Sequence, residues 1–390
     1  MPLGWETGDM TKDTAHSTSA RGWVAALAGM VMALAAGCAP LQQGALRVDQ
    51  PGPPGFTGHV FTSFDGAKLG LDIYEPRARA GAGLGPCDAG GGIVLSTGVD
   101  TCAASAAIYR AEPDVVIIAA HGMNDYAGTF KSAGAWWSAH GAAVYAYDQR
   151  GFGRSPGWMI WPQHDVMRQD LVTAVAVARE RHPDAKIAVV GESMGGAMAI
   201  TAFADHANAP RADALILSAP GLRGWQTLPW LYGASLWVSS HVRPDWIVVP
   251  PEGVRVVTTD NNAKLREMWF NPLVQKSNRI DSVYGVVSIM EEADIKIVDL
   301  PASVPTLFLY GAKDEVILPD GVQRAVEKMP AHIRTAYYAN GYHMLMNDLQ
   351  AEKVWGDILA FVRAPGNQLP SGAPGLPWGR QNGQQTAANR

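Results

Sequence analysis

Short apolar runs alternate with amphipathic stretches through most of the chain. Residues 114–120 (DVVIIAA) and 142–147 are continuous apolar runs, typical of strands buried on both faces of a parallel sheet. Between the second of these runs and the next one, at 186–190, the apolar residues Leu171, Val175 and Ala178 recur at helical spacing. This alternation predicts an α/β fold with a mostly parallel central sheet and helices on both faces. The remaining predicted strands and helices lie at 186–190, 212–217, 306–310, 322–328, 335–339 and 351–362.

Two segments depart from this rhythm. Residues 59–64 and 69–74 are short alternating runs separated by Asp65-Gly66, a pattern that predicts an antiparallel hairpin. Residues 221–296 are rich in Trp and Leu, are interrupted by Pro and show no strand alternation. We interpret 221–296 as a helical lid inserted between strands of the sheet.

The composition of the flanking segments sets the domain limits. Residues 39–56 are polar and rich in Pro and Gly, which predicts a tether rather than a folded element. Residues 57–363 then form the α/β domain. Residues 364–390 are rich in Pro, Gly, Gln and Asn, and we expect them to be disordered.

The N-terminus has the features of an export signal. Lys12 and Arg21 precede an apolar run of about 15 residues, too short for a good transmembrane helix. The run ends Leu34-Ala35-Ala36-Gly37-Cys38, which resembles a bacterial lipobox, although Ala35 stands where Leu is usual. We therefore predict a signal peptide over 1–38 and lipidation of Cys38. An ordinary secretory signal is the alternative, and translation could start at Met1 or Met10.

This signal predicts a location in the bacterial cell envelope. Ala39 is not the Asp that retains lipoproteins in the inner membrane, so a lipid-anchored protein would reside in the outer membrane. With an ordinary signal the protein would be periplasmic. The expected membrane contact is the N-terminal lipid anchor.

The other two cysteines lie in a Gly- and Ala-rich insertion at 77–112. In an exported protein Cys87 and Cys102 could pair, closing a loop of about 15 residues and contributing roughly 3 kcal/mol. Two free thiols in a loose insertion are the alternative.

Charge and motifs exclude several classes of partner. A net charge of −5 and a pI near 6.1 provide no basic surface for nucleic acid. The sequence shows no metal-ligand cluster, and Gly151-Phe152-Gly153 lacks the third glycine of a dinucleotide-binding loop. We expect no cofactor and no metal.

The candidate chemistry begins at Gly191-Glu192-Ser193-Met194-Gly195. The apolar run 186–190 leads into this G-x-S-x-G turn and then into a helix of small residues, the pattern of a nucleophile elbow. Side chains at Gly191 or Gly195 would crowd the turn, which also needs unusual dihedral angles. Ser193 is therefore the predicted nucleophile.

A serine hydroxyl needs a base, and the base needs an orienting acid. In α/β-hydrolases these follow the serine in the order acid, then histidine. Asp314 and His343 each follow a predicted strand in that order, with Glu315 as the competing acid. The backbone N–H groups of Met123 and Met194 are the predicted oxyanion hole. His121 is interpreted as shaping that loop, and Asp148 and Arg150 as fixing a turn beside it.

Taken together, these motifs resemble the monoacylglycerol lipase / lysophospholipase group of α/β-hydrolases, which is serine aminopeptidase-like. The similarity covers about 56–362 and is carried by the following blocks: His121-Gly122, Asp148 to Ser155, Gly191 to Gly196, Gly311 to Asp314 and Gly341 to His343. The resemblance implies a Ser193–His343–Asp314 triad, a lid over an acyl-chain site, and a monoacylglycerol or lysophospholipid substrate. The insertion with Cys87 and Cys102 and the export signal depart from the group.

Two other functions stay open at this point. A peptidase of the prolyl aminopeptidase type shares the fold, but it needs acidic residues to hold a free amine, and only Glu291 and Glu292 are candidates. A non-catalytic envelope lipoprotein is the second alternative. The physiological substrate and the oligomeric state do not follow from the sequence.

Overall fold

A computed structural model describes residues 40–47, 51–76, 112–249 and 256–378. The cysteines Cys38, Cys87 and Cys102 lie outside these residues, and so do the predicted lipidation and disulfide.

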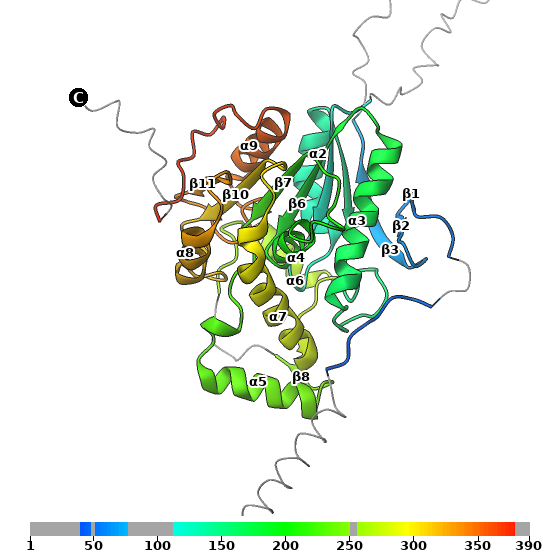
Figure 1. Cartoon of the computed structure of the whole chain (residues 1–390), viewed down its shortest axis with the longest axis vertical. Helices are drawn as coiled ribbons and strands as arrows, with labels where there is room; N and C mark the ends of the chain where they lie inside the picture. Colours follow the sequence, from blue (N-terminus) through cyan, green and yellow to red (C-terminus); the bar gives the residue numbers. More distant parts are fainter. Residues whose placement is uncertain (1–39, 48–50, 77–111, 250–255, 379–390) are drawn as a thin grey trace, which may run out of the picture.

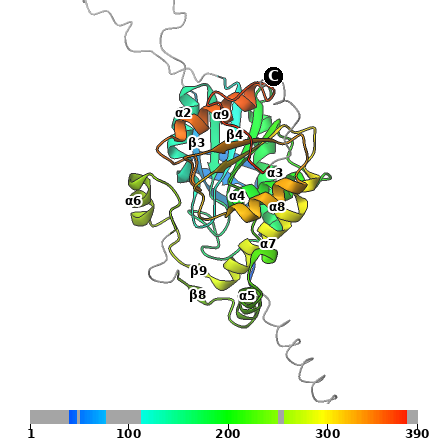
Figure 2. The ribbon, with the colours of Figure 1, turned by 90° about the vertical axis from the view of Figure 1, so that its left-hand side faces the viewer.

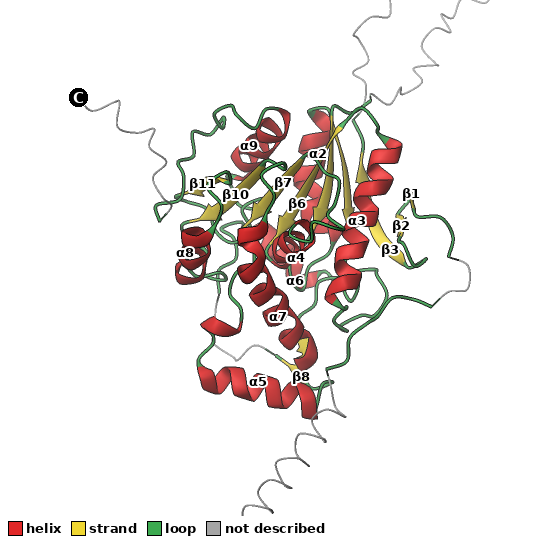
Figure 3. Cartoon of the chain, viewed as in Figure 1, coloured by secondary structure: helices red, strands yellow, loops and turns green. Residues whose placement is uncertain are grey.

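The described residues are organised around one large sheet, shown in yellow in Figure 3. Its nine strands follow the order β1-β2-β3-β5-β4-β6-β7-β10-β11. From β5 to β11 all neighbours are parallel, whereas β1, β2 and β3 pair antiparallel and β3 joins β5 antiparallel. The bounds are β1 Gly55–Thr57, β2 Val60–Thr62, β3 Lys68–Tyr74, β4 Val115–Ala120, β5 Ala142–Tyr147, β6 Lys186–Glu192, β7 Ala214–Ser218, β10 Thr306–Gly311 and β11 Arg334–Tyr338.

Helices cover both faces of this sheet (Figure 1). Alternate strand residues point to opposite faces, so each continuous apolar strand supplies two cores. Along β4, Val116 and Ile118 join the core under α3, α4, α7 and α8, whereas Val115 and Ile117 join the core under α2 and α9. The predicted α/β fold is confirmed. The bounds of these helices are α2 Lys131–Ala139, α3 His164–Arg181, α4 Met194–Phe203, α7 Ile280–Lys296, α8 Pro319–Lys328 and α9 Ala351–Arg363.

The predicted hairpin forms between β2 and β3. Val60 pairs with Gly70 and Thr62 with Lys68. The turn between them is closed by a hydrogen bond from the Ser63 N–H to the Ala67 carbonyl.

The segment between β7 and β10 contains the predicted helical insertion. It holds α5 (Trp230–Val242), α6 (Asn262–Phe270) and α7, with a short antiparallel pair, β8 (Ile247–Val248) and β9 (Asn278–Arg279). Figure 2 shows α5 and β8 at one end of the molecule and α6 on its side, nearer the sheet. The last turns of α7 belong to the main core, through Ile289 and Ala293.

Two expectations about flanking segments are wrong for the residues that the structure describes. Within the predicted tether, the Gln43 N–H donates to Trp161 O, and residues from Gly55 form β1. Within the tail that we expected to be disordered, Leu369 and Leu376 are buried and the Tyr337 N–H donates to Pro374 O. Residues 364–378 are ordered because β11 is an edge strand whose unpaired backbone groups and apolar face accept a covering segment.

Among the described helices, none has both the length and the apolar content needed to cross a bilayer.

Candidate active site

Ser193 stands alone between β6 and α4 in a strained backbone conformation. Its φ of 53° and ψ of −116° lie where residues other than glycine are rare. A Cβ atom on Gly191 would lie 2.6 Å from the Gly195 carbonyl oxygen, and one on Gly195 would lie 2.2 Å from Ala120 O. Only glycine fits at both positions, as the sequence predicts.

The loop after β4 packs against Ser193. A Cβ atom on Gly122 would lie 3.2 Å from the Cβ of Ser193. The next residue is Met123, and Met194 is the first residue of α4, whose first amides have no acceptor within the helix. Neither amide donates to another described residue. Both N–H groups therefore have no acceptor among the described residues, and the α4 dipole adds positive potential at Met194.

His121 is fully buried and held as a neutral ring. The Gln149 N–H donates to Nε2 over 2.9 Å, so the proton is on Nδ1, which donates to Gly122 O over 2.8 Å. Burial lowers the pKa of His121, which is consistent with a neutral ring. Because C=O and N–H of one trans peptide point in opposite directions, the bond to Gly122 O also orients the Met123 N–H. These contacts agree with our interpretation of His121 as a residue that shapes this loop.

Asp314 and His343 form the buried pair that follows β10 and β11. His343 Nδ1 lies 2.8 Å from Asp314 Oδ2, while Asp314 Oδ1 accepts from the N–H groups of Val316 and Ile317. Burial lowers the pKa of His343, but the charge of Asp314 and its hydrogen bond outweigh burial, so the net pKa is raised. The arrangement fixes the ring and leaves Nε2 for a proton from another group.

Backbone contacts bring these two loops together. The Lys313 N–H donates to Gly341 O over 2.9 Å, and a Cβ atom on Gly311 would lie 2.5 Å from the Gly341 carbonyl. The competing acid Glu315 instead accepts from the Val257 N–H. Asp314, not Glu315, is thus the carboxylate that contacts His343.

Ser193 and His343 belong to the same edge of the sheet, at the carboxyl ends of its parallel strands. β6 leads into the elbow and β11 into the histidine loop, and both belong to one run of parallel neighbours, β6-β7-β10-β11, so the two loops emerge at the same edge. No hydrogen bond joins the Ser193 hydroxyl to His343 within the described chain. Such bonds are often long without substrate and shorten in the complex.

Two further buried acids belong to the site loops, and neither was predicted from the sequence: Glu192 precedes Ser193, and Asp348 contacts the residue before His343. Burial, with a contribution from Asp125, raises the pKa of Glu192 to about 8. Burial also raises the pKa of Asp348 to about 6, and its carboxylate accepts from the Tyr342 N–H and the Thr259 hydroxyl. Asp348 thereby positions the loop that carries His343. Throughout the described ranges, this site included, no three His, Cys, Asp or Glu side chains gather as metal ligands would.

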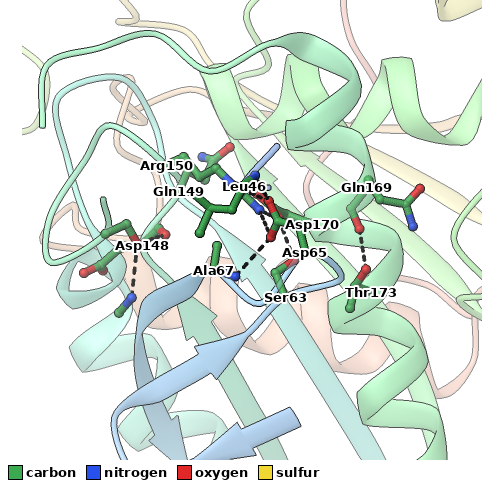
Figure 4. A network of polar contacts seen from close by, with 12 residues as sticks. Leu46, Ser63, Asp65, Ala67, Asp148, Gln149, Arg150, Gln169, Asp170 and Thr173 are labelled. Carbon is green, nitrogen blue, oxygen red and sulfur yellow. Dashed lines mark hydrogen bonds and ion pairs between the residues drawn. The ribbon is translucent and has the colours of Figure 1, made fainter. Parts of the chain in front are cut away.

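Arg150 is buried beside this site and forms a network with two carboxylates (Figure 4). Its guanidinium makes paired hydrogen bonds of 2.7–2.8 Å to both Asp65 and Asp170. Asp65 also accepts from the Leu46 N–H. The network joins four segments: the N-terminal segment through Leu46, the β2–β3 turn through Asp65, α3 through Asp170, and the loop after β5 through Arg150. The same loop carries Gln149, whose N–H donates to His121. Arg150 fixes this loop as predicted, through Asp65 and Asp170. Asp148 also fixes it, because its carboxylate accepts from the Ala127 N–H and from the backbone and side chain of Arg154.

Replacing Arg150 should therefore cost stability. Arg150→Met leaves two buried carboxylates without a cation, so we expect the free energy of unfolding to fall by about 3–5 kcal/mol in urea titrations. The matched control is Arg179→Met, because Arg179 pairs with Asp213 in a partly exposed site. That variant should lose no more than about 1 kcal/mol. Equal losses of unfolding free energy in the two variants would show that the buried Arg150 network stabilises the fold no more than the partly exposed Arg179–Asp213 pair does.

Comparisons with known proteins identify the family of the chain. The sequence profile described as "Serine aminopeptidase, S33" matches residues 111–350. A monoacylglycerol lipase from Mycolicibacterium smegmatis is 25% identical over 263 residues, which cover 64% of this chain and 89% of the relative.

Solved structures share the fold. The monoacylglycerol lipase of Paleococcus ferrophilus superposes with a TM-score of 0.52 at 21% identity, covering 64% of this chain and 95% of that one. A soluble variant of monoglyceride lipase from Saccharomyces cerevisiae, in complex with a substrate analogue, gives 0.56 at 15% identity, covering 82% and 97%.

Proposed function

Because the chain belongs to the serine aminopeptidase S33 family, within the monoacylglycerol lipase group of α/β-hydrolases, we propose that it hydrolyses monoacylglycerol or lysophospholipid esters. At the coarser level it is a carboxylic ester hydrolase. The observation that carries the proposed hydrolysis is the buried Asp314–His343 pair at the sheet edge that also holds the strained Ser193, and the monoacylglycerol lipases among the relatives support the choice of substrate.

The proposed reaction follows from the positions of these groups. His343 Nε2 takes the proton of Ser193 as the Oγ atom attacks the ester carbonyl, and Asp314 stabilises the resulting imidazolium. The Met123 and Met194 amides stabilise the oxyanion. Collapse of the intermediate breaks the C–O bond, and the imidazolium protonates the leaving alcohol. Water, deprotonated by His343, then attacks the acyl-Ser193 ester and releases the fatty acid.

Two acids that could hold the amine of a peptide substrate are already engaged. Glu292 bonds to His164, Arg168 and Lys296; burial raises its pKa, but these partners outweigh burial and lower it to about 2. Glu291 accepts from the backbone and side-chain N–H groups of Gln226. Both carboxylates link helices of the fold, which favours an ester substrate over an aminopeptidase substrate.

Hydrolysis of graded substrates tests this assignment. We expect p-nitrophenyl esters with medium or long acyl chains to be cleaved with kcat/KM at least about 10³-fold above aminoacyl anilides, because Glu291 and Glu292 are both held by other partners. Monoacylglycerol and lysophosphatidylcholine, followed by fatty-acid release, then identify the natural head group. Faster cleavage of prolyl anilides would replace the esterase assignment with the peptidase.

We also propose that the mature protein is anchored in the cell envelope through a lipid on Cys38. The proposal rests on the lipobox-like end of the apolar run, since Cys38 lies outside the described residues. Mass spectrometry of the mature N-terminus decides it: diacylglyceryl-Cys38 supports the anchor, and a free N-terminus at another residue contradicts it.

A further inference from the structure

Helix α6 is held at its two ends rather than along its length. None of its nine residues, Asn262–Phe270, is buried, and Figure 2 shows the helix standing out from the side of the molecule. A helix in a folded protein normally gains its stability by packing an apolar face on the body. The contacts that hold α6 in place are instead made by the segments on either side of it, 258–261 and 271–276.

The segment before α6 is bonded to the loop that carries His343. The hydroxyl of the buried Thr259 donates to Asp348 Oδ1 over 2.7 Å, and Asp348 Oδ2 accepts from the Tyr342 N–H over 2.8 Å. Thr259 thus reaches the residue before the histidine through one carboxylate. Three further hydrogen bonds of 2.8–3.0 Å join the same two segments: Met344 N–H to Thr258 O, Leu349 N–H to Asp260 Oδ1, and Asn261 Nδ2 to Asn347 O.

The segment after α6 is bonded to the loop that carries the Met123 amide. The Gln275 N–H donates to Asn124 O over 2.8 Å, which fixes the chain one residue beyond Met123. The side-chain Nε2 of Gln275 donates to Gly151 O over 2.6 Å. Gln275 is buried, so both of its hydrogen bonds are sheltered from water and are costly to break.

Side chains also cap both ends of α6 and make it a stiff connection. At its start Asn261 Oδ1 accepts from the Lys264 N–H over 3.1 Å. At its end the ammonium group of Lys276 donates to three carbonyl oxygens, those of Met268, Asn271 and Val274. The histidine loop and the oxyanion loop are therefore linked to each other through one capped helix.

From these contacts we propose that residues 258–276 form a brace that positions two parts of the catalytic machinery at once. One end positions the loop of His343 through Asp348, and the other end positions the loop of Met123 through Asn124. Thr259 and Gln275 are positioning residues, because they act through these loops and not on the ester. The inference rests on the proposed function and adds the part of the inserted segment that holds its base and its oxyanion hole.

Thr259→Val tests the end of the brace at the histidine loop. Valine keeps the shape of the side chain but cannot donate to Asp348. We expect kcat on p-nitrophenyl esters to fall about 10- to 10²-fold with KM within about twofold of the parent, because a displaced base slows the reaction without weakening substrate binding. Rates are divided by the amount of Ser193 that a fluorophosphonate labels at completion, so unfolded protein does not count as lost kcat. Thr259→Ser, which keeps the hydroxyl, should restore most of the parent kcat.

Thr227→Val is the matched control for Thr259→Val. Thr227 belongs to the same inserted segment, but its hydroxyl donates to Gly224 O over 2.8 Å rather than to the loop of His343 or Met123. Its kcat should stay within about twofold of the parent value, since no contact to the brace is lost.

Gln275→Leu tests the end of the brace at the oxyanion loop. Leucine removes the bond to Gly151 O and loosens the backbone bond to Asn124. We expect kcat to fall about 10-fold or more, and affinity for a trifluoromethyl ketone, which forms an oxyanion on Ser193, to fall by a similar factor. Parent values of kcat in either Thr259→Val or Gln275→Leu would overturn the brace and leave the proposed function intact.

The rate of fluorophosphonate labelling separates the brace from the choice of substrate. Labelling needs the serine, its base and the oxyanion amides but no particular ester. If the parent chain is labelled yet cleaves no acylglycerol or lysophospholipid, the proposed substrate is wrong, and slower labelling of the two variants still supports the brace. Labelling of either variant at the parent rate overturns the brace. A folded parent chain that is not labelled overturns both proposals.

Hydrogen exchange in the unmodified full chain covers variants that fail to fold. The N–H groups of Met344 and Gln275 are the backbone bonds between the brace and the two loops. Mass spectrometry with fragmentation should find both exchanging on the order of 10³-fold more slowly than in the unfolded chain, as expected for contacts that open rarely. Exchange of either group at the rate of unfolded chain would show that the brace opens freely and would overturn the proposal.

Discussion

Ser193→Ala should reduce ester hydrolysis by about 10⁶-fold in kcat, the loss typical when the nucleophile of such a triad is removed. The reason is that alanine cannot form the acyl-enzyme. The residual reaction is then direct attack of water on the bound ester, with the oxyanion hole as the remaining catalytic contribution. Reaction with a fluorophosphonate probe should also disappear. The measurements are steady-state rates on p-nitrophenyl esters and probe labelling of folded protein.

Ser218→Ala is the matched control for this prediction. Ser218 is a buried serine at the end of β7, and its backbone carbonyl, which the substitution preserves, accepts from the Ser193 N–H. Its rate should stay within about threefold of the parent, as expected when no transition-state contact is lost. Labelling that survives in Ser193→Ala would identify a different nucleophile. No labelling of the folded parent chain would favour the non-catalytic lipoprotein.

Asp314→Asn should lower kcat by about 10⁴-fold with little change in KM. An Asn side chain can still accept from the Val316 and Ile317 amides, so the loop keeps its shape. However, its NH₂ group would face His343 Nδ1 and stabilise the tautomer with the proton on Nε2. That tautomer cannot take the Ser193 proton.

The pH profile distinguishes this electrostatic role from a structural one. In the parent chain Asp314 raises the pKa of His343 above its ordinary value. Since only the neutral ring acts as a base, kcat/KM should rise with pH through that raised pKa. In Asp314→Asn the raising influence is lost and burial lowers the pKa, so the acid limb should move to lower pH.

Glu315→Gln provides the matched control for Asp314→Asn. Among the described residues, the Glu315 carboxylate accepts one hydrogen bond, from the Val257 N–H, and glutamine can keep that bond. Its activity and pH profile should match those of the parent chain. An acid limb that stays in place in Asp314→Asn would show that Asp314 does not set the ionisation of His343.

Local sequence pattern predicted the sheet because burial on both faces leaves a direct signature. Residues 115–120 and 142–147 had to be apolar throughout, since alternate residues enter different cores. The hairpin at Asp65-Gly66 was equally local, as a turn is specified by its own residues. The steric need for Gly191 and Gly195 also followed from one short motif.

The sequence did not predict which charged side chains pair with each other, because pairing depends on residues that lie far apart in the chain. Arg150 pairs with Asp65 and Asp170, at separations of 85 and 20 residues, whereas Asp148 is only two positions away. Adjacent carboxylates differ in the same way: Asp314 faces His343 and Glu315 turns to Val257. Composition likewise led to a wrong prediction of disorder for 364–378. This segment is ordered because it packs along the edge strand β11.

By itself, then, the sequence determined the α/β alternation, the elbow around Ser193, and the chain order in which Asp314 and His343 follow it. Those features depend on the period of buried side chains and on the sterics of one turn, both of which act over a few residues. Only the tertiary structure decided which acid contacts His343, which carboxylates neutralise Arg150, and that the segments flanking α6 are bonded to loops of the site. Pairing depends on which distant segments arrive at the same place, and a one-dimensional pattern does not contain that information.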